Sequence, residues 1–136
     1  MDYIQFQEHM DPKDLLLVAV GGALGACLRY LVIIWMPSEN FPWATLSVNL
    51  IGSLALGIII SLSSNQILDE RSTLLIATGI LGAFTTMSTY SIETITLWKN
   101  NRLTAIIYVM ITAIIGPILA FIGFESIQSG FFFNKN

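Results

Sequence analysis

Residues 79–91 read GILGAFTTMSTYS and decide the fold. Gly79 and Gly82 precede five Ser or Thr residues within seven positions, a composition that no lipid-facing helix would choose. We expect the helix to break here, because irregular backbone at membrane depth occurs where protein or a cavity surrounds it. Freed carbonyls near Gly82 and Thr85 would suit a small hard cation such as Na⁺. The alternative is an unbroken helix whose hydroxyls bond to carbonyls one turn earlier.

The segment lies inside the third of four apolar stretches. The chain has 136 residues, of which 54% are hydrophobic and 11% charged, whereas soluble domains carry roughly 25% charged residues. A soluble enzyme and a disordered chain are therefore excluded. A membrane-crossing helix needs about 20 residues, and each stretch reaches that length. We predict an all-α integral membrane protein: one membrane domain, residues 1–136, with spans 15–35, 43–62, 73–98 and 103–124 and polar tails 1–14 and 125–136.

Charge and functional groups exclude further classes. The formal net charge is −3, and the six basic residues are scattered, so nucleic acid is not expected as a partner. No catalytic constellation is present, so we expect no enzyme. The basic residues set no clear orientation by the positive-inside rule. Either other factors override this weak signal, or copies insert both ways and form an antiparallel dimer. The basic residues on the side of the termini are Lys13, Arg71 and Lys135, and those toward the other side are Lys99, Arg102 and Arg29.

Polar residues within the spans are the candidates for function. They recur every four residues, which places each set on one helical face. Such stripes are typical of helix packing, but a mid-span amide can also aim two N–H donors at a ligand. Arg29 and Glu93 are the ionisable residues within spans; they either pair or reach separately to the interface, and we expect structural anchoring. The polar stripe of the second span consists of Thr45, Asn49, Ser53 and Gly57, and that of the fourth span consists of Tyr108, Thr112 and Gly116.

Three motifs together resemble the CrcB/Fluc fluoride channels. They are GGALGACLRY at residues 21–30, TLSVNLIGS at 45–53 and the segment 79–90, and the resemblance covers residues 15–124. It implies a four-helix subunit with a broken third helix, which pairs as an antiparallel, dual-topology dimer in the plasma membrane. It also implies two fluoride pores per dimer and a structural Na⁺ held by the backbone carbonyls of Gly82 and Thr85.

The resemblance also assigns pore residues. It places Asn49, Ser88, Tyr108 and Thr112 along the fluoride path and Glu93 shortly after the break. Two pore phenylalanines of the family are replaced here, by Met87 and Tyr90. A third family position, which is often serine, is Gly116 in this chain.

The implied activity is passive, fluoride-selective export from the cytoplasm. The replaced positions leave two hypotheses open: a homodimer with a modified pore, or one half of a heterodimer with a related subunit. An alternative is a small proton-coupled multidrug exporter, but such exporters need a carboxylate in the first span, which here holds Arg29 and no acid. A non-transporting scaffold would not explain the Gly, Thr and Ser segment.

Overall fold

The computed structural model describes residues 11–36 and 40–133. Within these residues, four helical spans are long and apolar enough to cross a membrane: Pro12–Trp35, Trp43–Ser64, Glu70–Asn100 and Arg102–Ser129. The all-helical, four-span prediction is therefore confirmed. Most of the predicted N-terminal tail, residues 1–10, and residues 134–136 with Lys135 lie outside the described residues.

Three helices are continuous and one is composite. The continuous helices are α1 (Pro12–Trp35), α2 (Trp43–Ser64) and α6 (Arg102–Phe133). Each extends beyond the predicted apolar stretch, because helical hydrogen bonding continues into the flanking polar residues; α6 includes much of the predicted C-terminal tail. The third span consists of α3 (Glu70–Thr73), the π-helix η2 (Leu74–Leu81), α4 (Gly82–Phe84) and α5 (Met87–Asn100).

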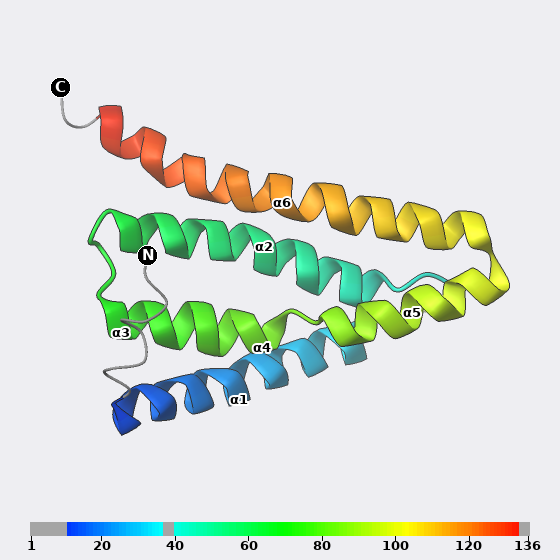
Figure 1. The fold of residues 1–136 in the computed structure, drawn as a ribbon, viewed down its shortest axis with the longest axis horizontal. Helices are drawn as coiled ribbons and strands as arrows, with labels where there is room; N and C mark the ends of the chain where they lie inside the picture. Colours follow the sequence, from blue (N-terminus) through cyan, green and yellow to red (C-terminus); the bar gives the residue numbers. More distant parts are fainter. Residues whose placement is uncertain (1–10, 37–39, 134–136) are drawn as a thin grey trace.

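The four spans lie side by side in one layer, in the order α1, third span, α2, α6 (Figure 1). Glycines allow two of these contacts to be close. A Cβ at Gly25 of α1 would overlap the Ile80 carbonyl, and one at Gly57 of α2 would overlap the Ala120 carbonyl of α6. Small residues let membrane helices approach each other in this way. Past the break, α5 packs against α6.

The third span is broken at Thr85 and Thr86, as the sequence predicts. Both residues have extended backbone, with φ −73° and ψ 156° at Thr85 and φ −147° and ψ 113° at Thr86. The unbroken alternative is therefore wrong. The π-helix that precedes the break was not predicted. Such wide turns are rare in proteins, and those that occur are often found at functional sites.

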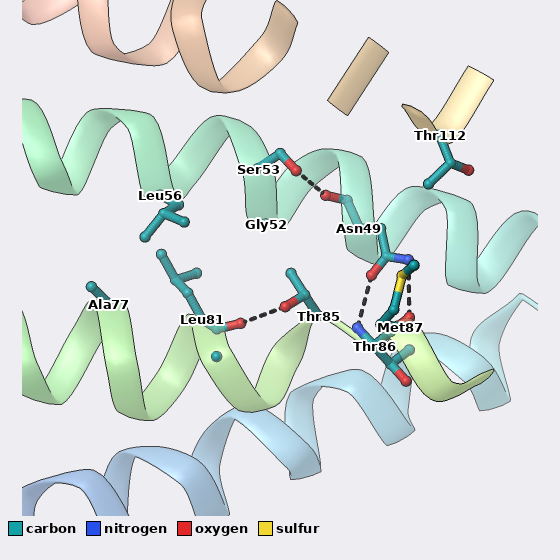
Figure 2. A pocket seen from close by; sticks show the side chains of 11 residues that line it. Asn49, Gly52, Ser53, Leu56, Ala77, Leu81, Thr85, Thr86, Met87 and Thr112 are labelled. Carbon is teal, nitrogen blue, oxygen red and sulfur yellow. Dashed lines mark hydrogen bonds between the residues drawn. The ribbon is translucent and has the colours of Figure 1, made fainter. Parts of the chain in front are cut away.

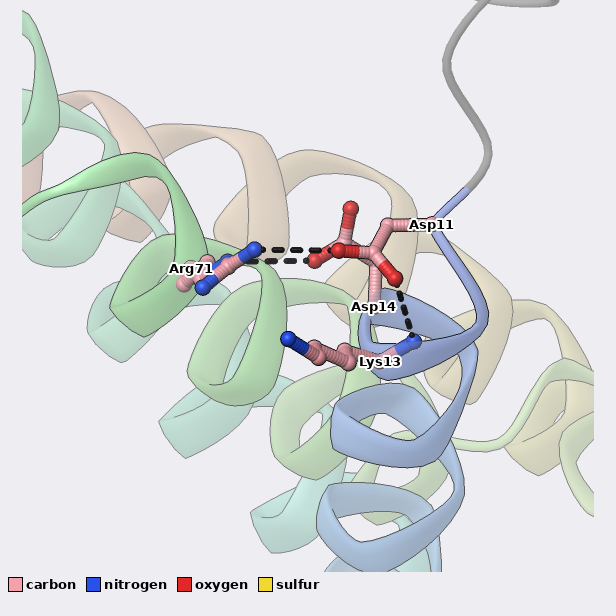
Figure 3. Close-up of polar contacts among 4 residues, drawn as sticks. All are labelled: Asp11, Lys13, Asp14 and Arg71. Atoms are coloured by element: carbon pink, nitrogen blue, oxygen red, sulfur yellow. Dashed lines mark hydrogen bonds and ion pairs between the residues drawn. The ribbon is translucent and has the colours of Figure 1, made fainter.

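A charged cluster joins the beginnings of α1 and the third span (Figure 3). Arg71 donates from Nη2 to Asp11 Oδ2 at 3.1 Å, and its Nε lies 3.5 Å from Asp14 Oδ1. Asp11 also caps α1 by accepting from the Lys13 N–H at 3.0 Å. The Arg71 side chain is 58% exposed, so solvent screens these pairs and each contributes at most about 1 kcal/mol.

Candidate functional site

The side-chain amide of Asn49 pairs with the backbone of the break. Its Nδ2 donates to the Thr86 carbonyl at 3.1 Å, and its Oδ1 accepts from the Thr86 N–H at 2.8 Å. Asn49 lies in the first half of α2, while Thr86 is 5% exposed. One side chain thereby gives the Thr86 N–H the partner that the interrupted helix cannot supply, and it adds a second donor to the carbonyl that begins the hydrogen bonds of α5. Satisfied backbone groups are the condition for irregular backbone inside a membrane.

The same residues release two carbonyls from the helical ladder. In a continuous α-helix the Thr86 N–H would bond the Gly82 carbonyl, and the Thr89 N–H would bond the Thr85 carbonyl. Here the Thr86 N–H bonds Asn49, and the Thr89 N–H donates to Thr86 Oγ1 at 3.3 Å in an N-cap that starts α5. These are the two carbonyls that the sequence analysis singles out for a cation.

A cavity of about 290 Å³ adjoins the break, between α2 and the third span (Figure 2). At one end its walls carry hydroxyl and amide groups, and at the other they carry Leu56, Ala77 and Leu81. None of the residues that line it is charged. Its polar lining consists of Asn49, Ser53, Thr85, Thr86 and Thr112, with Gly52, Gly82 and Met87 completing the wall.

The hydroxyls of this lining are held on their own helices. Ser53 Oγ donates to the Asn49 carbonyl at 2.8 Å, Thr85 Oγ1 to the Leu81 carbonyl at 3.0 Å, and Thr112 Oγ1 to the Tyr108 carbonyl at 2.9 Å. A hydroxyl bonded in this way can rotate about its C–O bond and donate to another acceptor. The cavity therefore contains donors that can be redirected toward a small anion.

Glu93 is held by a second polar cluster. Its Oε1 accepts from Thr45 Oγ1 and its Oε2 from the Tyr108 hydroxyl, each at 2.8 Å. Tyr108 is fully buried. Glu93 does not line the cavity, and among the described residues no ion pair joins it to Arg29, which is half-buried. Within the described part of this chain the two residues therefore do not pair, and the expected structural anchoring of both stays a prediction.

The predicted pore residues do not all meet at the cavity. Asn49, Met87 and Thr112 line it, and the Met87 side chain is 73% exposed. Ser88 is exposed, with its Oγ 3.3 Å from Thr86 Oγ1. Tyr90 does not line the cavity, and its ring packs on Tyr108 with centroids 5.1 Å apart. Phe41 also contacts Tyr108, in an edge-on arrangement with centroids 5.5 Å apart.

Thr86 is the residue that the sequence analysis missed. Its side chain caps the N-terminus of α5 by accepting from the Thr89 N–H, and its backbone pairs with Asn49. Two signals were available: Thr is a preferred N-cap residue, and a second hydroxyl, Thr89, follows three positions later.

Comparison with known proteins identifies the family. The family model described as "CrcB-like protein, Camphor Resistance (CrcB)" matches residues 16–124. This chain belongs to the CrcB family. A curated relative in Thermus thermophilus, named fluoride-specific ion channel FluC, is 41% identical over 120 residues, which cover 85% of this chain and 94% of the relative. FluC 1 of Methanosarcina acetivorans is 38% identical over 109 residues, 78% of this chain and 83% of the relative.

The CrcB match extends through all four helical spans, and it includes the break, the Asn49 pairing and every polar residue of the cavity lining. Four membrane-crossing helices, in a family whose curated members here are named ion channels, indicate a multi-pass membrane protein.

Proposed function

We propose that this chain forms a fluoride-selective channel, through which fluoride leaves the cytoplasm passively across the plasma membrane. The observation that carries the proposal is the uncharged cavity at the break of the third span, whose mainly apolar wall carries an amide and several hydroxyl groups. Relatives that are 38% and 41% identical over most of the chain carry the name of a fluoride-specific ion channel, which supports the choice of ion.

The chemistry of fluoride suits this cavity. Fluoride is small and strongly hydrated, so a pathway must replace its water with hydrogen-bond donors. Asn49 and the lining hydroxyls can donate, and no Lys or Arg lines the cavity to trap the ion, since conduction requires binding that is weak enough to release. Tyr90 would supply a weakly positive ring edge. Ser88 and Tyr108 would line the path farther along.

We further propose that a structural Na⁺ binds the carbonyls of Gly82 and Thr85. The donor set fits, because both oxygens have lost their helical N–H partners to Asn49 and to the α5 cap. A hard cation prefers oxygen ligands and would supply a fixed positive charge that holds the break. Among the described residues no group of three or more His, Cys, Asp or Glu side chains could hold a metal, so backbone oxygens are the candidates.

Two subunits would complete the pathway, as an antiparallel dual-topology dimer. Gly82 and Met87 lie on the cavity wall yet are exposed in the single chain, and a second subunit would cover them. That subunit is another copy of this chain or a related one. Coexpression with any adjacent related gene, followed by copurification, separates these arrangements, and an active homodimer alone would rule out the obligate heterodimer.

A proton-coupled multidrug exporter is disfavoured by the position of Glu93. An exporter of that class alternates a carboxylate between protons and drug within its cavity. Here the carboxylate accepts two hydrogen bonds, from Thr45 and Tyr108, and lies outside the cavity lining.

The test is fluoride efflux from liposomes that contain only this purified chain, with chloride as the control ion. Fast efflux of fluoride without chloride is the expected result. A correctly assembled dimer that passes neither ion, alone or with a related subunit, would refute the proposal. Efflux that requires a proton gradient would indicate a coupled transporter instead.

A further inference from the structure

Ser53 of α2 and Gly116 of α6 face each other beside the cavity. Ser53 lines the cavity one turn along α2 from Asn49 (Figure 2). Gly116 is buried, one turn along α6 from Thr112, and a Cβ placed on it would lie 3.5 Å from Ser53 Oγ. The Ser53 hydroxyl is therefore directed at a position where α6 has no side chain.

Close helix packing does not require this glycine. At Gly57 and Gly123 a Cβ would overlap a backbone carbonyl of the facing helix, whereas at Gly116 the nearest atom stands at ordinary van der Waals distance. Glycine inside a helix costs about 1 kcal/mol relative to alanine, so another property must justify it. One such property is local: Pro117 follows, and glycine avoids the clash between the proline ring and a preceding Cβ. Substitution of Ser53 therefore tests the pair without changing the residue before Pro117.

The Ser53 hydroxyl can be redirected at little cost. It donates to the Asn49 carbonyl at 2.8 Å, but that carbonyl also accepts the backbone N–H of Ser53 as its α-helical partner. Rotation of the hydroxyl consequently leaves no buried acceptor without a donor. Because Gly116 has no side chain, only the backbone of α6 stands opposite the rotated hydroxyl.

We propose that Ser53 is an additional donor to the conducted anion, one helical turn from Asn49, and that Gly116 keeps its hydroxyl accessible. The proposal rests on the proposed function, since it places a further ligand on the same pathway. It assigns a small, hydrogen-bond-accepting anion to the junction of α2 and α6.

The experiment measures fluoride efflux from liposomes for Ser53→Ala, Ser53→Thr and the double variant Ser53→Ala with Gly116→Ser. The matched control is Ser64→Ala, because Ser64 lies on the same helix, donates to the Ile60 carbonyl at 2.8 Å and is exposed away from the cavity. Size-exclusion chromatography and thermal unfolding in detergent monitor assembly.

Loss of one hydroxyl donor is expected to slow efflux roughly tenfold in Ser53→Ala, while Ser64→Ala matches the wild type. Restored efflux in Ser53→Thr or in the double variant supports the proposal, because either variant returns a hydroxyl to the junction. Unchanged efflux in Ser53→Ala overturns it. So does failure of both hydroxyl-bearing variants to restore efflux while they assemble normally, and so does loss of assembly in Ser53→Ala, which would mean a packing role. A wild-type chain that passes no fluoride would instead refute the channel itself.

Discussion

Asn49→Ala is expected to destabilise the protein and to slow fluoride efflux at the same time. The substitution removes both hydrogen bonds between the Asn49 amide and the Thr86 backbone, at 2.8 and 3.1 Å. Thr86 is 5% exposed, so its backbone depends on the amide for these two contacts. The break would then contain a buried N–H without a partner, and the Thr86 carbonyl would keep only its helical donor from α5.

The magnitude follows from these two groups. A buried donor that loses its partner costs about 1–3 kcal/mol, and an ordinary hydrogen bond contributes about 1 kcal/mol. Together they predict a loss of about 2–4 kcal/mol in the free energy of unfolding. Asn65→Ala is the matched control: this asparagine lies at the end of the same helix and donates a single bond, to the Ser61 carbonyl at 2.8 Å. We expect it to cost about 1 kcal/mol and to leave efflux unchanged.

A second substitution tests the direction of the two Asn49 hydrogen bonds. Asn49→Asp keeps the oxygen that accepts from the Thr86 N–H, but it places a second acceptor against the Thr86 carbonyl, where Nδ2 now donates at 3.1 Å, and adds a charge within the membrane. It should therefore be at least as destabilising as Asn49→Ala, and its negative charge beside the cavity should also repel fluoride. Unfolding by titration with a denaturing detergent, and efflux from liposomes, measure the two effects. If either variant unfolds like the wild type, Asn49 does not hold the break as argued.

Two further substitutions test packing and the second polar cluster. Gly25→Ala places a methyl against a backbone carbonyl of the third span and should cost about 1–3 kcal/mol of stability; Gly22→Ala, whose Cβ would stand 4.0 Å from its nearest neighbour, should be neutral or stabilising in the same unfolding assay. Tyr108→Phe removes the 2.8 Å bond to Glu93 from a fully buried ring and should cost about 1.5–3 kcal/mol. Tyr90→Phe is its control, and equal losses in both would contradict a specific role for the Tyr108 hydroxyl.

The helices and the break could be predicted because their causes are local. Apolar stretches of membrane-crossing length determine the spans. The dense run of Gly, Ser and Thr identifies where the third span is interrupted, since hydroxyls can satisfy backbone groups that leave the helix. The extended residues Thr85 and Thr86 lie within that run.

The partners of the polar residues could not be predicted, because they lie far apart in the sequence. The stripe on the second span suggested one shared face, yet its members have different roles. Thr45 donates to Glu93, 48 residues away, and Asn49 pairs with Thr86, 37 residues away. Four-residue spacing gives the direction of a side chain but not what it meets. For the same reason the sequence left a pairing between Arg29 and Glu93 open.

The π-helix depends on packing that no local pattern encodes. Within η2, Gly79 lies so close to α1 that a Cβ on it would stand 2.9 Å from the Gly21 Cα. Glycine tolerates this contact, and the wide turn lies where the two backbones cross. A propensity argument favours an ordinary α-helix for LLIATGIL, so the tertiary contact must supply the difference.

The break is held from three directions, which bears on how it could act. Asn49 pairs with Thr86, Gly52 packs against the Thr85 methyl, and the Thr86 hydroxyl caps α5. These three contacts position the break within the subunit itself, so its free carbonyls and nearby donors are in place before an ion arrives. Groups placed in advance of binding stabilise a charge without reorganisation. A weakly binding, fast pathway for one small ion needs this property, and a transporter that must alternate between two conformations does not.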